Sequence, residues 1–365
     1  MTVEATREQA GGGRPARAAI ADADIHNTWP DPAALDPYLP ARWRRLRAQL
    51  GERLHAGAQY PRLNPAAART DAWPPEGGLP GSSLALMREQ LLDRWSVEHG
   101  ILNPLLEAGE LLNLEYGAAF ARAINDWQVA EWLEPEPRLR ASITVPYEDA
   151  ALAVAEMERR ADDARFVQVL LASRTLEPLG RRRYWPLYAA AEAAGLPIGI
   201  HFGGAGGFPT TAAGIPSFYF EEHAGMATAF QDQLTSLVFE GVFERFPRLR
   251  VVLIEGGFAW LLPLMWRLDR TWRMLRDELE HVTRPPSETI RDRVYLTTQP
   301  IEEPPQPQLL ARLLDRMGMD DRLLFATDYP HWDFDAPDRA LPPVLGAARR
   351  ERLLRGNARA LYGFG

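Results

Sequence analysis

The chain has 365 residues, of which 46% are hydrophobic, and its 41 basic and 49 acidic residues give a net charge of −8. This length allows one large domain or two ordinary ones, and the dispersed acidic charge argues against a nucleic-acid partner. The absence of cysteine excludes disulfides, thiolate metal ligands and a cysteine nucleophile. No apolar run could span a membrane, and residues 1–17 lack the apolar core of a signal peptide, so we expect a disordered tail on a cytoplasmic protein.

The first predicted strand begins at Ile20 and ends in polar residues. Residues two apart on a strand share a face, so Asp22, Asp24 and His26 should lie on one side of it. A loop and a helix over 35–50 follow. The Pro-, Gly- and Ala-rich stretch 51–83 is too long for an ordinary connection. We expect it to be an insertion after strand one that forms a lid, a binding loop or an oligomer contact.

After a helix over 83–98, the sequence alternates regularly between short apolar segments and helical patterns. The predicted strands are 99–105, 139–145, 166–171, 196–201, 249–254, 294–297 and 323–326. The predicted helices are 115–133, 147–161, 184–194, 221–246, 260–281, 307–317 and 351–361. With the opening strand this makes eight strand–helix units, which predicts an α/β fold, a (β/α)₈ TIM barrel in one domain over 18–365. The rival, an open doubly wound sheet, would have a glycine-rich loop after the first strand, where this chain carries a histidine.

Polar side chains that can bind a metal stand at the ends of three predicted strands. Asp24 and His26 end the first strand, His201 the fifth, and Asp328 follows the eighth. In a barrel the carboxyl ends of all strands meet on one face, and two imidazoles with two carboxylates suit Zn²⁺ or Mn²⁺. Taken singly, each residue has a structural explanation, such as a solvated strand end, a hydrogen-bonded core histidine or a helix cap. Their joint position favours one metal site.

Four motifs carry a resemblance to a known family. They are Asp22-x-Asp24-x-His26, LPIGIHFG at 196–203, LFATDYPH at 324–331 and GNARALY at 356–362. Together they resemble the amidohydrolase superfamily, amidohydrolase 2 type, in the branch related to aminocarboxymuconate-semialdehyde decarboxylase that also contains the resorcylate and salicylate decarboxylases. The similarity runs from about Ile20 to the C-terminus, apart from 51–83.

The resemblance implies a single-metal barrel and a homo-oligomer, a dimer or higher. It makes the ligands of one divalent cation Asp24, His26, His201 and Asp328. Zinc is the first expectation and manganese the alternative.

The chain departs from this family after the sixth strand. There the family commonly carries a His followed by Gly, and the His acts as acid and base; this chain has Glu255 and Gly256. A glutamate can transfer protons if burial raises its pKa towards neutrality, or it can join the metal ligands. Catalysis could instead fall to His223, whose structural alternative is an exposed residue at a helix start. In a hydrolase, Asp328 could also accept a proton.

Several further residues are candidate substrate contacts. Arg174 follows the fourth strand and would suit a carboxylate, although a surface salt bridge explains it equally well. His331 could support Asp328, touch substrate, or pack on Trp332 as a loop histidine. Trp29 and Trp332 could wall an aromatic pocket or serve plain packing.

The function that the resemblance implies is a metal-dependent decarboxylase, or carboxy-lyase, of an aromatic or unsaturated carboxylic acid. One alternative is a metal-dependent hydrolase of an amide, a lactone or a C–C bond. Another is a related cyclisation in secondary metabolism. An inactive barrel is the third alternative, and the complete set of four ligands argues against it. The expected partner is a small-molecule substrate, with neither nucleic acid nor membrane involved.

Overall fold

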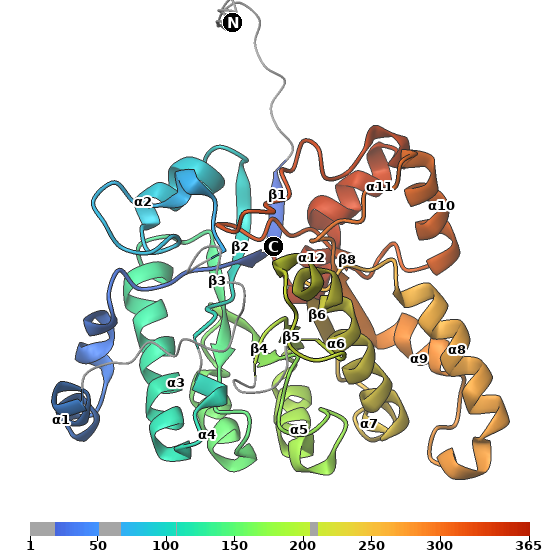
Figure 1. Ribbon diagram of the computed structural model, residues 1–365, viewed down its shortest axis with the longest axis horizontal. Coiled ribbons are helices and arrows are strands. Elements are labelled where there is room, and N and C mark those ends of the chain that lie inside the picture. Colours follow the sequence, from blue (N-terminus) through green and yellow to red (C-terminus); the bar gives the residue numbers. More distant parts are fainter. Residues whose placement is uncertain (1–18, 51–66, 107, 205–210) are drawn as a thin grey trace, which may run out of the picture.

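The computed structural model describes residues 19–50, 67–106, 108–204 and 211–365. Within them, eight parallel strands form one sheet whose spatial order is the sequence order, and the chain passes once round the molecule (Figure 1). The strands are β1 (Ile20–Ile25), β2 (Val97–Leu102), β3 (Leu139–Thr144), β4 (Phe166–Ala172), β5 (Ile198–His201), β6 (Val251–Ile254), β7 (Val294–Thr297) and β8 (Leu323–Leu324). The predicted TIM barrel is confirmed.

The barrel closes through the segment that follows β8. The Ala23 N–H donates to the Phe325 carbonyl at 2.9 Å, and the His26 N–H donates to the Tyr329 carbonyl at 2.7 Å. In the opposite direction, the Asp328 N–H donates to the Asp24 carbonyl at 3.1 Å. This closure places Asp24 and Asp328 side by side, although they lie at opposite ends of the chain.

The strands are apolar runs because helices cover their outer faces and side chains fill the barrel. The longer helices are α1 (Ala41–Leu50), α3 (Leu114–Gln128), α4 (Ala150–Arg160), α5 (Trp185–Ala194), α6 (Tyr219–Phe239), α8 (Leu261–Met274), α9 (Pro286–Arg293) and α10 (Pro307–Met317). The shorter ones are α2 (Leu84–Met87), α7 (Val242–Arg245), α11 (Ala347–Glu351) and α12 (Asn357–Tyr362). None of the helices in the described ranges is long and apolar enough to cross a membrane.

Several predicted boundaries were wrong. The helix expected over 83–98 is α2 followed by one π-helical turn, and β2 already begins at Val97. The helix expected over 221–246 breaks at Gly241, whose φ of 78° ends α6 and starts α7. Helix α9 was missed because two prolines open it. A proline in the first turn is compatible with a helix, since its missing N–H would have no partner there.

The predicted tail and the first part of the predicted insertion, 51–66, lie outside the described residues. Residues 67–69, in the rest of the insertion, contact the loop after β8. Ala68 pairs with His331 in an antiparallel bridge, the Arg69 N–H donates to the Pro330 carbonyl at 3.0 Å, and the Trp332 N–H donates to the Ala67 carbonyl at 2.8 Å. The insertion is therefore anchored beside Asp328.

Candidate active site

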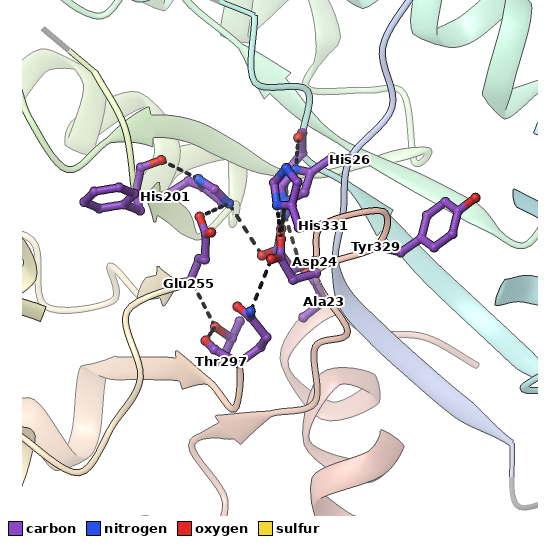
Figure 2. Close-up of polar contacts among 12 residues, drawn as sticks. Ala23, Asp24, His26, His201, Glu255, Thr297, Tyr329 and His331 are labelled. Carbon is purple, nitrogen blue, oxygen red and sulfur yellow. Dashed lines mark hydrogen bonds and ion pairs between the residues drawn. The ribbon is translucent and has the colours of Figure 1, made fainter. Parts of the chain in front are cut away.

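The four predicted ligands meet at the carboxyl end of the barrel, and Figure 2 shows three of them, Asp24, His26 and His201, close together. Asp24 lies in β1, His26 follows it, His201 ends β5 and Asp328 follows β8, and all four are buried. Ligand atoms of Asp24, His26 and His201 lie within 4.8 Å of one another, and those of His26, Asp328 and His331 do so as well. The two groups share His26 and form one cluster.

The distances in this cluster are short. The Nε2 atom of His26 lies 2.7 Å from Oδ1 of Asp328 and 3.5 Å from Oδ1 of Asp24. The Nε2 atom of His201 lies 3.5 Å from Oδ2 of Asp24. Burial by itself would lower the pKa of His26, but the Asp24 and Asp328 carboxylates outweigh it and raise that pKa to about 9. In the metal-free chain a proton on His26 therefore offsets part of the negative charge.

Backbone carbonyls orient both histidines. His26 Nδ1 donates to the Asn103 carbonyl at 2.8 Å, and His201 Nδ1 donates to the Phe202 carbonyl at 2.7 Å. Because a carbonyl only accepts hydrogen bonds, Nδ1 carries the proton in each ring. Each Nε2 then faces the cluster as the potential ligand atom.

Two buried atoms at the centre of the cluster have no hydrogen-bond partner among the described residues. They are Oδ2 of Asp24 and Nε2 of His201, which lie 3.5 Å apart. Burying a polar atom without a partner is costly, and a cation held by both atoms would remove this cost. Imidazole nitrogen and carboxylate oxygen are donors that both Zn²⁺ and Mn²⁺ accept. The residues present therefore fit a single divalent cation.

Glu255 lies at the edge of this cluster, directly after β6. Its Oε2 atom is 3.2 Å from Nε2 of His201, and its backbone N–H donates to Oγ1 of Thr297 at 3.0 Å. Its φ is 62°, which non-glycine residues adopt uncommonly. Burial raises the pKa of Glu255 well above its usual range, and the carboxylates of Asp328 and Asp24 add to the effect. This shift favours the protonated form of Glu255, which suits a proton donor.

Asp328 has the opposite electrostatic environment. His26 Nε2 and His331 Nδ1 each lie 2.7 Å from its Oδ1, and Gln299 Nε2 donates to its Oδ2 at 3.1 Å. Burial opposes its charge, but His331 and His26 outweigh burial and hold the pKa of Asp328 below its usual range. One buried site thus combines a glutamate whose pKa is raised with an aspartate whose pKa is lowered. Such a separation is typical of acid–base sites.

His223, on α6, reaches this site through two residues that the sequence did not single out. Its Nε2 lies 3.0 Å from Oδ2 of Asp333, and Gln299 Nε2 donates to the same oxygen at 2.9 Å. Gln299 also bonds Asp328, so it links the two carboxylates. Gln299 follows β7 and Asp333 lies in the loop after β8. Their positions after strands were the only sequence signal, and Gln and Asp are common there.

The predicted aromatic contacts lie in different surroundings. Trp332 is 48% exposed, its Nε1 donates to the hydroxyl of Tyr219 at 3.0 Å, and its ring lies 5.4 Å from that of His223. Trp29 is buried instead and packs edge-on against Phe120 and Trp127 in the hydrophobic core. Only Trp332 is thus linked to the residues around His223.

Arg174 and His331 have close partners. Most of the Arg174 side chain is buried, with its guanidinium 4.9 Å from the Phe202 ring centre and 4.0 Å from the Glu222 carboxylate. Its Nε atom has no partner among the described residues. This buried position excludes the alternative that Arg174 forms a surface salt bridge. His331 bonds Asp328 and stacks on His26 with ring centres 4.5 Å apart, so its ring lies against the cluster.

Known proteins resemble the chain over nearly its whole length. A gamma-resorcylate decarboxylase from Polaromonas sp. is 26% identical over 314 residues, which are 78% of this chain and 92% of the relative. An amidohydrolase from Mycobacterium avium subsp. paratuberculosis has the same fold, with a TM-score of 0.70, 21% identity and coverage of 95% of this chain and 98% of that one. A dihydroxybenzoic acid decarboxylase from Polaromonas sp., with bound manganese and the inhibitor 2-nitroresorcinol, gives a TM-score of 0.63, 21% identity and coverage of 94% and 97%.

The family itself follows from a further comparison. The sequence model described as amidohydrolase matches residues 21–364, which include all of the barrel strands except Ile20 and all the clustered residues. The family predicted from the motifs is thereby confirmed, and the chain belongs to the amidohydrolase family.

Proposed function

We propose that the protein is a metal-dependent carboxy-lyase that removes CO₂ from an aromatic carboxylic acid with a neighbouring hydroxyl group. The observation that carries the proposal is the buried carboxyl group of Glu255, whose Oε2 lies 3.2 Å from Nε2 of His201 at the proposed metal cluster. Burial raises the pKa of this group well above its usual range, which suits a proton donor. Decarboxylation of an aromatic acid needs a proton donor at this place. The similarity to gamma-resorcylate decarboxylase, over 92% of that enzyme, supports the same reaction.

Asp24, His26, His201 and Asp328 would hold the cation. When bound, it would supply a positive charge that stabilises an anionic substrate. Imidazole ligands favour zinc, our first assignment, while manganese is bound in the dihydroxybenzoic acid decarboxylase from Polaromonas sp.. The metal content of the purified protein decides between them.

Glu255 would protonate the ring carbon that carries the carboxylate. The bond between that carbon and the carboxylate then breaks, its electron pair restores the aromatic ring, and CO₂ leaves. The Glu255 carboxylate regains its proton from water, so one proton is consumed for each CO₂ released. Asp328 stays ionised because His26 and His331 bond its Oδ1.

Other side chains would position the substrate. His331, stacked on His26, and Trp332, next to His223, offer ring faces to an aromatic substrate. Arg174 would bind an anionic group through its unpartnered Nε. Trp29 is buried against Phe120 and Trp127, so we assign it to packing.

One observation favours a hydrolase as the second candidate. Asp328 is ionised beside the proposed cation and could take a proton from an attacking water. The substrate would then be an amide, a lactone or a C–C bond. In this reaction Glu255 would act in its ionised form, which burial disfavours, so the hydrolase makes less use of the residue that distinguishes the site.

Substrate turnover separates the two candidates. The purified protein, loaded in parallel with Zn²⁺ and with Mn²⁺, is incubated with gamma-resorcylate and other hydroxybenzoates, and separately with aryl esters and amides. We expect CO₂ release from at least one hydroxybenzoate and no ester or amide turnover. Ester or amide turnover without CO₂ release would replace the carboxy-lyase by the hydrolase.

We also infer a cytoplasmic homo-oligomer of at least two chains. On α8, Trp266 and Met274 are 60% and 69% exposed, and apolar side chains on an outer helix suit a contact between copies. Light scattering of the purified protein measures the assembly. A monomer at micromolar concentration would remove this part of the proposal.

A further inference from the structure

Asn103, directly after β2, contacts two of the proposed metal ligands. Its side-chain Nδ2 donates to Oδ1 of Asp24 at 2.8 Å, and its backbone carbonyl accepts from Nδ1 of His26 at 2.8 Å. The Asn103 backbone N–H donates to the Ile25 carbonyl at 2.8 Å, which fixes this segment against β1. Asn103 is fully buried, and sequence reasoning did not identify it.

The side-chain amide of Asn103 can adopt only one orientation. Its Oδ1 accepts from Oγ of Ser142 at 2.5 Å and from Nε2 of Gln168 at 3.1 Å. Its Nδ2 donates to the Ala23 carbonyl at 3.1 Å as well as to Asp24. A reversed amide would place its oxygen against two acceptors and its NH₂ group against the Gln168 NH₂ group. The buried partners therefore keep the donor facing Asp24.

The same network extends to the C-terminal helix. The Tyr362 hydroxyl, on α12, donates to Oε1 of Gln168 at 2.8 Å, and Gln168 Nε2 donates to Oγ of Ser142 at 2.9 Å. All the hydrogen bonds along this path run in one direction. Tyr362 donates to Gln168, Gln168 donates to Asn103, and Asn103 donates to Asp24. The end of the chain is thereby connected to the cluster through buried side chains.

These bonds divide the two carboxylate oxygens of Asp24 between two roles. Oδ1 accepts from Asn103, whereas Oδ2 has no partner among the described residues and lies 3.5 Å from Nε2 of His201. We infer that Asn103 is the positioning residue of the metal site: it reserves Oδ2 of Asp24 and Nε2 of His26 for the cation. Gln168 and Tyr362 hold Asn103 in place. This inference rests on the metal site of the proposed function and is independent of the reaction catalysed there.

Asn125 provides a matched control. It is also fully buried, and its Nδ2 donates to the Thr144 carbonyl at 2.9 Å and to a carboxylate oxygen of Glu156 at 2.7 Å. Both asparagines thus bond one backbone carbonyl and one carboxylate, but Asn125 lies on α3 and bonds Glu156 of α4, outside the cluster. Replacing each by alanine removes the same kind of buried bonds.

The experiment measures the Zn²⁺ affinity of the full chain by competition with a chelator, alongside the Tm of the metal-free protein. We expect Asn103→Ala to weaken Zn²⁺ binding by about 10–100-fold, the usual effect of losing a residue that supports metal ligands. Asn125→Ala should lower Tm without changing the affinity. The visible absorption of the Co²⁺-loaded protein, which reports the ligand geometry, should change only in Asn103→Ala.

Wild-type affinity and an unchanged Co²⁺ spectrum in Asn103→Ala would overturn the inference, as would an equal loss of affinity in Asn125→Ala. If Asn103→Ala does not fold, Tyr362→Phe is compared with Tyr188→Phe, which loses a buried hydroxyl bond to the Leu179 carbonyl of 2.6 Å. Weaker Zn²⁺ binding in Tyr362→Phe alone supports the inference, and equal binding in both overturns it. A wild-type chain that binds no divalent cation would overturn the proposed metal site as well.

Discussion

Oε2 of Glu255 lies 3.2 Å from Nε2 of His201, and this nitrogen has no hydrogen-bond partner among the described residues. The two side chains extend from the ends of neighbouring strands, β6 and β5, which pair in register at His201 and Ile254. A carboxyl group whose pKa is raised by burial is thus placed at the rim of the proposed metal site. This pair is the centre of the proposed proton transfer.

Glu255→Gln should abolish most of the activity and leave the metal in place. The amide keeps the size of the side chain but cannot transfer a proton, so we expect kcat to fall by at least ~10²-fold. Metal content is measured with CO₂ release in the same preparation. A rate near that of the wild type would remove Glu255 from the mechanism.

Glu302→Gln is the control for this substitution. Glu302 is another carboxyl group whose pKa is raised by burial, but it accepts from the backbone N–H groups of Phe258 and Ala259 at 3.0 Å. Its loss should lower Tm and leave turnover per folded, metal-loaded molecule unchanged.

The pH profile of kcat tests whether Glu255 acts as an acid. Burial raises its pKa well above the usual range, so its proton is present at low pH and is lost as the pH rises through the raised value. We expect kcat to fall on the alkaline side and Glu255→Gln to lack this decline in its residual rate. A kcat that instead increases with pH in the wild type would indicate that Glu255 serves as a base.

Metal removal should lower the stability of the wild type and not that of His201→Ala. A ligand that binds only the folded state stabilises it, by about 2.7 kcal/mol at a concentration 100 times its Kd. Addition of Zn²⁺ to chelator-treated protein should therefore raise the Tm of the wild type. His281→Ala, at a histidine that bonds the Phe239 carbonyl away from the site, should respond like the wild type. An equal Tm increase in His201→Ala would contradict the metal site.

His223 should contribute less to turnover than Glu255. Its Nε2 is engaged by Asp333 at 3.0 Å, and that contact raises the pKa of His223. Because this imidazole is held by a carboxylate, we expect His223→Gln to raise KM and to reduce kcat by less than ~10-fold, below the usual contribution of a proton donor. If kcat falls as far as in Glu255→Gln, proton delivery belongs to His223 or to both residues.

Glu136 should make the fold sensitive to acid. Hydrogen bonds from Arg138 and Arg88 lower the pKa of this buried carboxyl group to about 2, against an ordinary value of 4.5. A depressed pKa stabilises the folded state above pH 4.5, and this contribution is lost as the pH falls through 2. It amounts to up to about 3 kcal/mol. Urea unfolding at several pH values should show a shallower acid dependence in Glu136→Gln, and an unchanged dependence would contradict this assignment.

The sequence by itself determined the barrel architecture and the positions of the four proposed metal ligands. Apolar runs that alternate with helical patterns require parallel strands, and parallel strands in a barrel bring their carboxyl ends together. Asp24, His26, His201 and Asp328 could therefore be placed on one face before any distance was known. The helix start at Pro286 and the break at Gly241 escaped prediction, because their local signals also suit loops and uninterrupted helices.

Only the tertiary structure decided the pKa shifts and the hydrogen-bond partners of the residues in the site. That Glu255 is buried near Asp24 and Asp328, which raises its pKa, depends on packing between β5, β6 and the segment after β8. The contacts of Asn103 and Gln299 could not be predicted from the sequence either. An amide after a strand is common, and the partners of these two come from distant parts of the chain. Residue type and strand register can indicate which groups meet. Protonation state and hydrogen-bond direction depend on burial and on neighbours that only the closed barrel brings into contact.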